Sequence, residues 1–332
     1  MKQTTAQKIL IQLIEHADSW LSGDALATQL EISRESVWKA INTLRKQGNE
    51  IESRKNMGYR FVKNASLNAA IINYYTNQDF AGRLYVDDEV TSTQSVAKAF
   101  LSHHQVTQPT VFVANAQTEG YGRRGRAFFS PAETGLYFSM ILPNPTHEWP
   151  KAGLMTTTFA VLITDVLRQF FPDQDFQYKW VNDIYLNHKK VVGILTEAVL
   201  DLESSSTAAF VVGIGMNVAT QLFPNDLKAK VTSMSATPVD RNLLVSRLIE
   251  TIAAHYMDYA NPEYLDAYRQ HAVVLGREVH LQLGYETVVG VAQQIEADGA
   301  LTIKTTDGEL RTFTSGEVTK VHYAGQQEDS QK

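Results

Sequence analysis

The spacing of hydrophobic residues changes twice along this 332-residue chain, and each change limits the folds that it can adopt. Apolar residues recur at helical spacing up to about residue 48, and segments of strand and helix type then alternate to about residue 272. Beyond Gly276 only short strand-like runs follow. At ~150 residues per domain, the length suggests two or three domains. We therefore predict an α+β protein with domains over residues 1–65, 69–272 and 273–325.

The first 65 residues predict a winged helix-turn-helix domain. Apolar stripes at helical spacing occupy residues 5–17 and 24–30, and Ser33 is a good N-cap for a third helix that runs to about residue 47. The pattern then becomes extended, and Asn56-Met57-Gly58 is a turn signal between two short strands. Three helices followed by a hairpin is the element order of a winged helix-turn-helix.

Charge distribution favours DNA as the partner of this end of the chain. Residues 1–65 carry ten Lys or Arg and seven Asp or Glu, a balance of +3, so the remainder must carry −9 to give the total of −6. A solvated face of an ordinary three-helix bundle is the alternative interpretation. Side chains that suit phosphates and base edges lie on the third helix at Arg34, Ser36, Lys39, Asn42 and Lys46, and on the hairpin at Arg54, Lys55 and Arg60.

The middle of the chain predicts a mixed α/β domain, and the end predicts a small β-barrel of SH3 type. Expected strands of the middle domain are 84–90, 110–116, 135–142, 176–180, 184–186, 191–200 and 208–214, and expected helices are 93–102, 151–171, 241–259 and 262–271. In the last domain Asp298-Gly299 and Asp307-Gly308 are hairpin signals. We expect the polar tail over 326–332 to be frayed.

Composition excludes several kinds of chemistry. Cysteine is absent, which rules out disulfides, thiolate nucleophiles and Cys-ligated zinc, and the nine histidines form no metal-binding motif. We therefore expect no protein-bound metal. The first residues lack the apolar core of a signal peptide, and the longest apolar stretch, 208–218, is far below the ~18 residues of a membrane helix. We expect a cytoplasmic protein with no membrane partner.

The run Gly120-Tyr121-Gly122-Arg123-Arg124-Gly125-Arg126 predicts a loop that grips an anion. Glycines let the backbone approach a ligand closely, and guanidinium groups offer planar donor pairs to phosphate or carboxylate. The run lacks the Gly-Lys-Ser/Thr ending of a P-loop. A solvated basic loop is the alternative, but this run lies between an apolar strand and the aromatic pair Phe128 and Phe129.

Three further motifs lie at the ends of expected strands. Lys179-Trp180-Val181-Asn182-Asp183 places a lysine in an apolar strand, where an anionic ligand is its plausible partner and a plain β-turn is the alternative. Gly213-Ile214-Gly215-Met216-Asn217 suits either a flat ligand against the backbone or close packing. In Thr91-Ser92-Thr93-Gln94 the hydroxyls suit a helix cap or a polar ligand, and without other observations we favour capping.

The chain resembles a biotin protein ligase over nearly its whole length. The resemblance rests on motifs that follow one another in this order: Ser92-Thr93-Gln94, residues 117–126, Lys179–Asp183, residues 190–197 and Gly213–Asn217. With the winged-helix front end, the resemblance is to the bifunctional form, which is both ligase and biotin operon repressor. It implies attack of the biotin carboxylate on the α-phosphate of Mg-ATP, which gives biotinyl-5′-AMP and pyrophosphate. Biotin then passes to a lysine of the biotin carboxyl carrier protein of acetyl-CoA carboxylase and of other biotin-dependent enzymes. Operator DNA and a homodimer of adenylate-bound chains are the further partners implied.

The resemblance also implies roles for residues at matching positions. Lys179 would bridge the carboxylate and the α-phosphate, and Arg123 would close the loop over both, so these two are the catalytic candidates. Implied biotin contacts are Ser92, Thr93, Gln94, Gln117, Gly120, Tyr121, Gly122, Arg123, Lys179, Gly193, Gly213 and Gly215. Implied ATP or adenylate contacts are Arg124, Arg126, Phe128, Asn182, Asp183 and Asn217.

Three positions depart from the family pattern, and two other functions remain open. Tyr121 stands where the family often has Arg, Val181 where it usually has Pro, and Gln94 where it often has Asn. A ligand-sensing transcription factor without catalysis would not need the three clustered arginines together with Lys179. A lipoate-type ligase shares the adenylation logic, but the arginine-glycine loop and the DNA-binding front end favour biotin.

Overall fold

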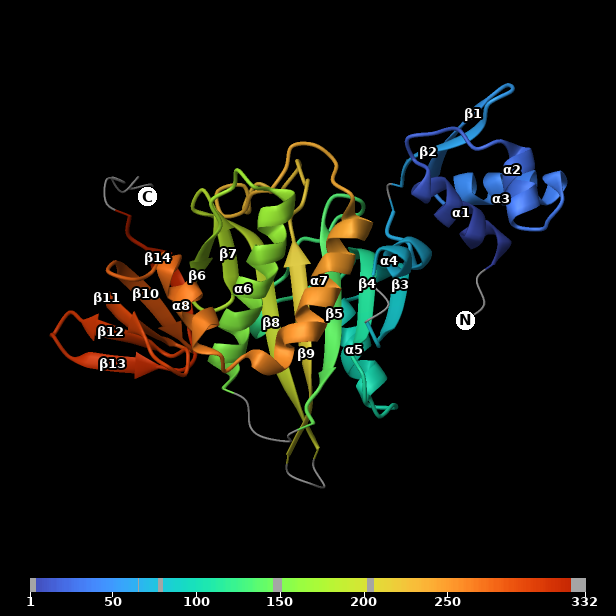
Figure 1. Ribbon diagram of the computed structural model, residues 1–332. Helices are drawn as coiled ribbons and strands as arrows, with labels where there is room; N and C mark the ends of the chain where they lie inside the picture. The colour runs from blue at the N-terminus through green and yellow to red at the C-terminus, as the bar shows by residue number, and fades with distance from the viewer. Residues whose placement is uncertain (1–3, 65, 77–79, 146–150, 202–205, 324–332) are drawn as a thin grey trace.

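A computed structural model describes residues 4–64, 66–76, 80–145, 151–201 and 206–323 of the chain (Figure 1). Its strands form a two-stranded, a seven-stranded and a five-stranded sheet, in that order along the chain. The helices lie before and around the seven-stranded sheet, so the protein is of the expected α+β class.

The N-terminal segment folds as the predicted winged helix-turn-helix. Thr4, Ser22 and Ser33 are the N-caps of its three helices, and each side chain accepts a hydrogen bond from the first turn. At the hairpin turn a Cβ on Gly58 would lie 2.0 Å from Leu21 O, so this position requires glycine. The elements are α1 (Thr5–Glu15), α2 (Gly23–Gln29), α3 (Arg34–Lys46), β1 (Asn49–Arg54) and β2 (Gly58–Asn64).

A short helix that the sequence pattern did not indicate, α4 (Ala69–Tyr75), joins this segment to the rest of the chain. Its Ile71 packs in the core of the N-terminal helices, whereas Ile72 packs in the core of the large sheet. Just before it, the backbone N–H of Asn68 donates to Asn242 Oδ1 at 2.8 Å. The segment between the first two predicted domains is therefore fixed to the central domain by a side chain far away in the sequence.

The seven-stranded sheet has the order β3-β4-β5-β9-β8-β7-β6, with β3 and β4 parallel and the other pairs antiparallel. Its strands agree with the expected ranges to within a few residues. They are β3 (Arg83–Val90), β4 (Thr110–Gln117), β5 (Leu136–Pro143), β6 (Gln177–Lys179), β7 (Asp183–Leu186), β8 (Lys189–Asp201) and β9 (Ser206–Met216).

Helices cover both faces of this sheet, because alternate residues of its central strands are apolar on both sides. Val111 and Val113 belong to the core shared with the long apolar helix α6, whereas Phe112 belongs to a separate cluster with Ala97 of α5. Figure 1 shows α6 and α7 side by side across one face. The helices are α5 (Thr93–Leu101), α6 (Ala152–Phe170), α7 (Arg241–His255) and α8 (Pro262–Gln270). A short 3-10 turn, Tyr256–Asp258, replaces the expected end of α7.

The C-terminal strands form an antiparallel sheet in the order β13-β12-β11-β10-β14. They are β10 (Glu278–Leu283), β11 (Glu286–Ile295), β12 (Leu301–Thr305), β13 (Leu310–Phe313) and β14 (Glu317–Val321). Trp180 Nε1 donates to Gly299 O at 2.9 Å, and the two sheets share one core. Within the described residues no pairing joins β13 to β14, so closure into a barrel stays a prediction. The expected domain end at residue 325 and the tail over 326–332 lie outside the described residues.

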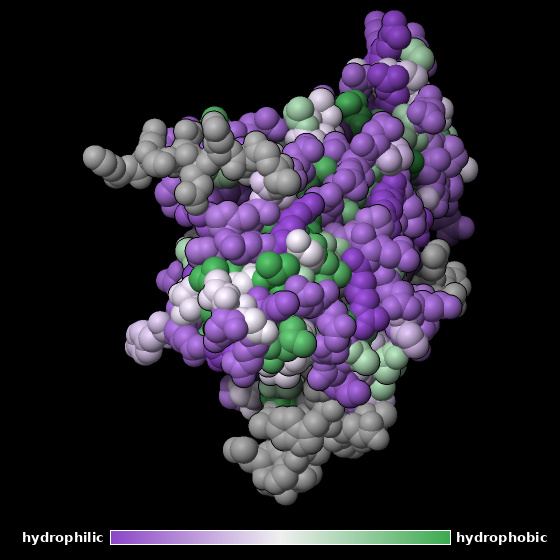
Figure 2. Space-filling model, turned by 90° about the vertical axis from the view of Figure 1, so that its left-hand side faces the viewer, coloured by the Kyte–Doolittle hydropathy of each residue, from purple (hydrophilic) through white to green (hydrophobic). Residues whose placement is uncertain are grey.

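The surface on the side of the C-terminal sheet is mostly hydrophilic, and apolar residues show there as a small area among polar ones (Figure 2). No helix in the described part of the chain is long and apolar enough to cross a membrane.

Candidate active site

Small residues on the α5 face of the large sheet leave a cavity of about 640 Å³. Gly193 and Gly215 are Cα partners across β8 and β9, and Ser139 and Gly213 are partners across β5 and β9. These positions lie on the same face of the sheet as Val211, which packs against α5. The loop over residues 121–126 and strand β14 complete the wall. We call this space the active-site cavity.

The glycines of the cavity floor permit close packing of two other lining side chains. A Cβ on Gly213 would lie 2.5 Å from Gln94 Oε1, and one on Gly215 would lie 2.7 Å from the ring of Phe128. These distances are shorter than real Cβ contacts. Close packing, one of the two interpretations of this motif, is therefore correct, and both glycines also line the cavity.

At the start of α5, hydroxyl groups point to side chains rather than to the helix end. Ser92 is the N-cap but its hydroxyl makes no capping bond, and the Thr93 N–H instead donates to Gln117 Oε1 at 2.9 Å. Thr93 Oγ1 lies 2.9 Å from Ser139 Oγ. The prediction that these hydroxyls cap the helix is wrong, because the side-chain oxygen of Gln117, at the end of β4, accepts the hydrogen bond from the N–H of Thr93.

The amide of Gln94 is fully engaged inside the protein, where it is 2% exposed. Its Nε2 donates to Glu197 Oε2 at 2.7 Å and to Val211 O at 3.2 Å, and its Oε1 accepts from Ser139 Oγ at 2.9 Å. Glu197 also pairs with Lys98 at 3.1 Å. Gln94 thus holds the cavity-lining Ser139 and the neighbouring Glu197 in place.

The arginine-glycine loop is folded against the C-terminal sheet, and this rules out a free solvated loop. Arg123 Nη1 donates to Gly316 O at 2.9 Å, Arg124 Nη2 donates to Gln282 O at 3.1 Å, and Arg126 forms an ion pair with Glu317. Arg124 lies at φ 58° inside a short 3-10 turn, Arg123–Gly125. Burial lowers the pKa of the Arg123 guanidinium, and the Asp183 carboxylate opposes this effect.

Lys179 presents a desolvated cation to the same cavity. Its Nζ donates to the Tyr185 hydroxyl at 3.1 Å, and within the described residues it has no ion-pair partner. Burial lowers the pKa of Lys179, the Asp183 carboxylate raises it, and the neighbouring Lys190 lowers it further. A buried ammonium group with only a neutral partner favours binding of an anion.

The turn after Lys179 is held by backbone and side-chain bonds. Asn182 Nδ2 donates to Ile194 O at 3.0 Å, and the Ile194 N–H donates to Asn182 O at 2.9 Å. Lys190 Nζ lies 2.6 Å from Asp183 Oδ1. The Asn and Asp of this motif therefore order the turn, and both also line the cavity.

The cavity thus has two chemically distinct ends. Neutral hydrogen-bonding groups lie at the start of α5, where Ser92, Thr93 and Gln117 meet. Cationic groups lie at the other end, at Lys179, Lys190 and Arg123. Such an arrangement suits a ligand with a polar uncharged head and an anionic tail, next to a second anion.

All but one of the candidate ligand contacts from the sequence line this cavity. The exception is Gly120, where a Cβ would lie 2.7 Å from both Gln117 Nε2 and Ser130 Oγ, so it serves the packing of the loop. Sequence reasoning missed lining residues of the C-terminal segment and of three other segments. They are Ser139, Tyr185, His188, Phe223, Lys230, Glu317, Thr319, Lys320, Val321 and Tyr323. No sequence motif could have found them, because only the fold brings β14 to the cavity.

The candidate DNA contacts lie on the outer side of the N-terminal helices and the hairpin. Those with exposed side chains are Arg34, Lys39, Lys46, Arg54 and Lys55, whereas Ser36, Asn42 and Arg60 are partly buried. Arg34 pairs with Asp24, Lys39 with Glu35 at 2.7 Å and Arg60 with Glu52 at 2.8 Å.

Arg45 ties α3 to the hairpin, since its Nη2 donates to Ile51 O and to Ser53 Oγ, each at 2.6 Å. Trp38, 58% exposed, lies on the same helix and was not foreseen. The hairpin is thus fixed beside α3.

Comparisons with known proteins agree with this architecture. Residues 86–217 match the Biotin/lipoate A/B protein ligase family, residues 5–60 match an HTH domain, and residues 274–321 match the Biotin protein ligase C terminal domain. The chain is 31% identical to Bifunctional ligase/repressor BirA of Bacillus spizizenii, over 94% of this chain and 98% of that relative. It is 28% identical to the protein of the same name from Escherichia coli, over 96% and 98%.

Among solved structures, the biotin protein ligase from Aquifex aeolicus in complex with biotin and ATP aligns with a TM-score of 0.60 and 28% identity. The alignment covers 71% of this chain and 97% of that one. The chain therefore belongs to the biotin protein ligase family, in its bifunctional ligase/repressor form.

Proposed function

We propose that the active-site cavity binds biotin and ATP together, forms biotinyl-5′-AMP, and passes the biotin to a lysine of a biotin carboxyl carrier protein. Lys179 carries this proposal: its partly buried ammonium group, without an ion-pair partner in the described residues, lines the same cavity as the neutral groups at the start of α5. Two anions, carboxylate and α-phosphate, repel each other, and a fixed cation between them lowers the barrier to their reaction.

The neutral end of the cavity suits the ureido ring of biotin. Ser92 and Thr93 offer hydroxyls there, and Gln117 is held by Ser130 and Thr93 in one orientation. Gly213 and Gly215 also line the cavity, where they let Gln94 and Phe128 pack close to the sheet. The carboxylate of biotin then extends toward Lys179, and Arg123 lies across the loop to cover it.

The cationic end suits the phosphates of ATP. Lys190 lies over the ring of Phe128, 5.8 Å from its centroid, and this ring is placed to stack on adenine. Arg124 and Arg126 lie at the rim, where triphosphate oxygens and pyrophosphate would be bound and released. Asn217 closes the floor near the Lys190 strand.

We infer that ATP enters with Mg²⁺, because the wall supplies the carboxylate of Asp183 for a hard cation. Asp183 Oδ1 makes no hydrogen bond of good geometry, although Lys190 Nζ lies 2.6 Å away. Mg²⁺ at nucleotides is held mainly by phosphate and water with one or two carboxylates, so Asp183 fits. When bound, the ion would neutralise phosphate charge.

The ligase half of the proposal is tested by pyrophosphate release. The chain is incubated with ATP and either biotin or lipoate, and then with an apo-carrier protein. We expect pyrophosphate with biotin and none above background with lipoate, followed by a single biotinyl-lysine on the carrier. Pyrophosphate with lipoate alone would identify a lipoate ligase, and none with either would leave a ligand sensor without catalysis.

We also propose that the adenylate-bound chain dimerises through the large sheet and represses biotin genes. The edge strand β3 of this sheet offers backbone for such a contact, and a two-fold operator requires two winged helices. Excess apo-carrier would compete for the same surface. Gel-shift titrations with and without biotin and ATP test this: unchanged operator affinity would leave a ligase without biotin-controlled repression.

A further inference from the structure

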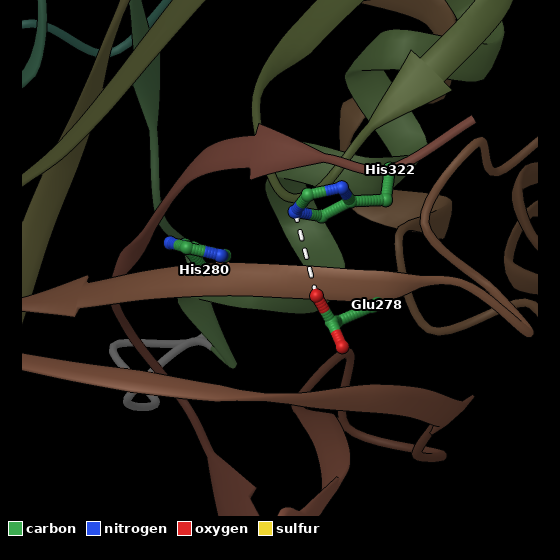
Figure 3. Close-up of side chains that lie close together, drawn as sticks. All are labelled: Glu278, His280 and His322. Atoms are coloured by element: carbon green, nitrogen blue, oxygen red, sulfur yellow. Dashed lines mark ion pairs between the residues drawn. The ribbon is translucent and has the colours of Figure 1, made fainter. Parts of the chain in front are cut away.

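Two histidines and one carboxylate gather on the outer face of the C-terminal sheet, away from the groups assigned above (Figure 3). Glu278 and His280 lie two residues apart on β10, with Val279 and Leu281 turned into the core between and beyond them. His322 follows the last residue of β14. The spacing of two along β10 places both of its side chains on the same outward face.

The sheet itself fixes the relation between Glu278 and His322. Val279 and Val321 are Cα partners, and the His322 N–H donates to Glu278 O at 3.0 Å. Thr319 Oγ1 further ties β14 to the carbonyl oxygen of His280 at 3.2 Å. Two side chains on adjacent strands therefore face one another without any loop having to close, as Figure 3 shows.

The distances suit tetrahedral metal coordination. His322 Nε2 lies 3.4 Å from Glu278 Oε1, and the three ligand atoms lie within 4.8 Å of one another. Metal–ligand bonds of about 2.0–2.1 Å in a tetrahedron separate ligand atoms by about 3.4 Å. The Glu278–His322 pair already has this spacing, so only the ring of His280 must turn inward.

His322 Nε2 is buried and has no hydrogen bond of good geometry within the described structure, which leaves its lone pair or proton without a proper partner. The cations next to the cluster are directed elsewhere. Lys320, the Cα partner of His280, lines the active-site cavity, and the guanidinium of Arg277 stacks over Tyr323, 4.8 Å from its centroid. Among the described residues, the groups that offer ligand atoms to one another here are Glu278, His280 and His322.

We propose that Glu278, His280 and His322 bind a divalent ion of the zinc class. Two imidazole nitrogens with one carboxylate suit Zn²⁺, Co²⁺ or Ni²⁺, whereas Mg²⁺ and Ca²⁺ prefer oxygen-only sites. Three protein ligands leave a fourth position for water. The sequence showed no metal motif, because the ligands come from two strands that only the fold makes neighbours.

Such an ion would clamp the end of β14 to β10. The same strand carries Glu317, Thr319 and Val321 on the wall of the active-site cavity, and Tyr323 follows His322 directly. Metal binding on the outer face would therefore stabilise the cavity wall that the C-terminal sheet supplies. This effect is separate from the adenylation chemistry, which uses no residue of the cluster.

The test uses the untagged full-length chain, stripped of metal with EDTA, and Co²⁺ as a probe with visible absorption. We expect one equivalent to bind, to be displaced by Zn²⁺, and to show the strong absorption of tetrahedral Co²⁺. His280→Ala and His322→Ala should each weaken binding at least tenfold, and Glu278→Gln should weaken it as well. Zn²⁺ should raise the thermal midpoint of the wild type but not of the His280→Ala/His322→Ala double variant.

His255→Ala is the matched control, because His255 Nδ1 also lies near a carboxylate, 3.2 Å from Asp258, without belonging to the three-ligand cluster. It should bind Co²⁺ as the wild type does. Unchanged binding by the double variant, or no saturable binding by the wild type up to millimolar Co²⁺, would overturn the proposal. Midpoints of the metal-free variants equal to that of the wild type would show that they remain folded.

Discussion

Replacing Lys179 by Met should separate catalysis from stability. The substitution keeps an unbranched side chain, one atom shorter, and removes a partly buried ammonium group that lines the cavity and has no ion-pair partner in the described residues. Loss of one preorganised group at a developing charge costs about 10²–10³ in rate, or about 2.7–4 kcal/mol. We expect adenylate formation to fall by that factor while the carrier-binding surface stays intact.

The free energy of unfolding should change little in the same variant. Removing the ammonium group deprives the Tyr185 hydroxyl of its donor at 3.1 Å, a loss of about 0.5–1.5 kcal/mol. Removing a desolvated charge acts in the opposite direction. Urea unfolding should therefore give a value within about 1 kcal/mol of the wild type.

The assay is biotin-dependent release of pyrophosphate, with Lys189→Met as the matched control. Lys189 is the first residue of β8, does not line the cavity, and donates to Lys228 O at 2.9 Å. The control should keep wild-type rates. A Lys179→Met rate within tenfold of the wild type, or a loss of activity explained by unfolding, would refute the assigned role.

Four further predictions follow from the same geometry. Arg123→Gly removes the bond to Gly316 O at 2.9 Å, so the loop should open and biotinyl-AMP should escape to label bystander lysines; normal retention by mass spectrometry would refute this. Because burial lowers the pKa of Lys179 from the ordinary 10.5, its cation is present at low pH and is lost as the pH rises. As the pH is raised, kcat/KM for biotin should therefore begin to decline at a pH lower than 10.5, and Lys179→Arg should move this decline to higher pH. Gly215→Ala places a Cβ 2.7 Å from the Phe128 ring, so KM for ATP should rise about tenfold; an unchanged KM would argue against adenine stacking there. Deleting residues 1–65 should abolish operator binding in gel shifts while some ligation remains.

Periodicity predicted the elements well, because most strands and helices here have regular apolar patterns and clear end signals. The continuous apolar run Val111-Phe112-Val113 marks a strand buried on both faces. Helix α4 was missed, since its two adjacent isoleucines serve two different cores rather than one stripe.

The site was predictable where motifs end strands, and unpredictable where other parts of the chain complete it. Lys179 and Gly213 lie at such ends and line the cavity. The capping of α5 by Gln117 and the wall supplied by Glu317 depend on tertiary contacts between segments distant in the sequence. Neither contact has a local signal, so only the folded chain could reveal them.

The most direct test of the account is the identity of the nucleotide that one turnover leaves on the enzyme. The chain is mixed with an equimolar amount of biotin and excess Mg-ATP, separated from free ligand, denatured, and its released small molecules are weighed by mass spectrometry. The account predicts biotinyl-5′-AMP at one equivalent per chain, and its near absence with Lys179→Met. Unreacted biotin and ATP from the wild type, or an equal yield of adenylate from Lys179→Met, would contradict it.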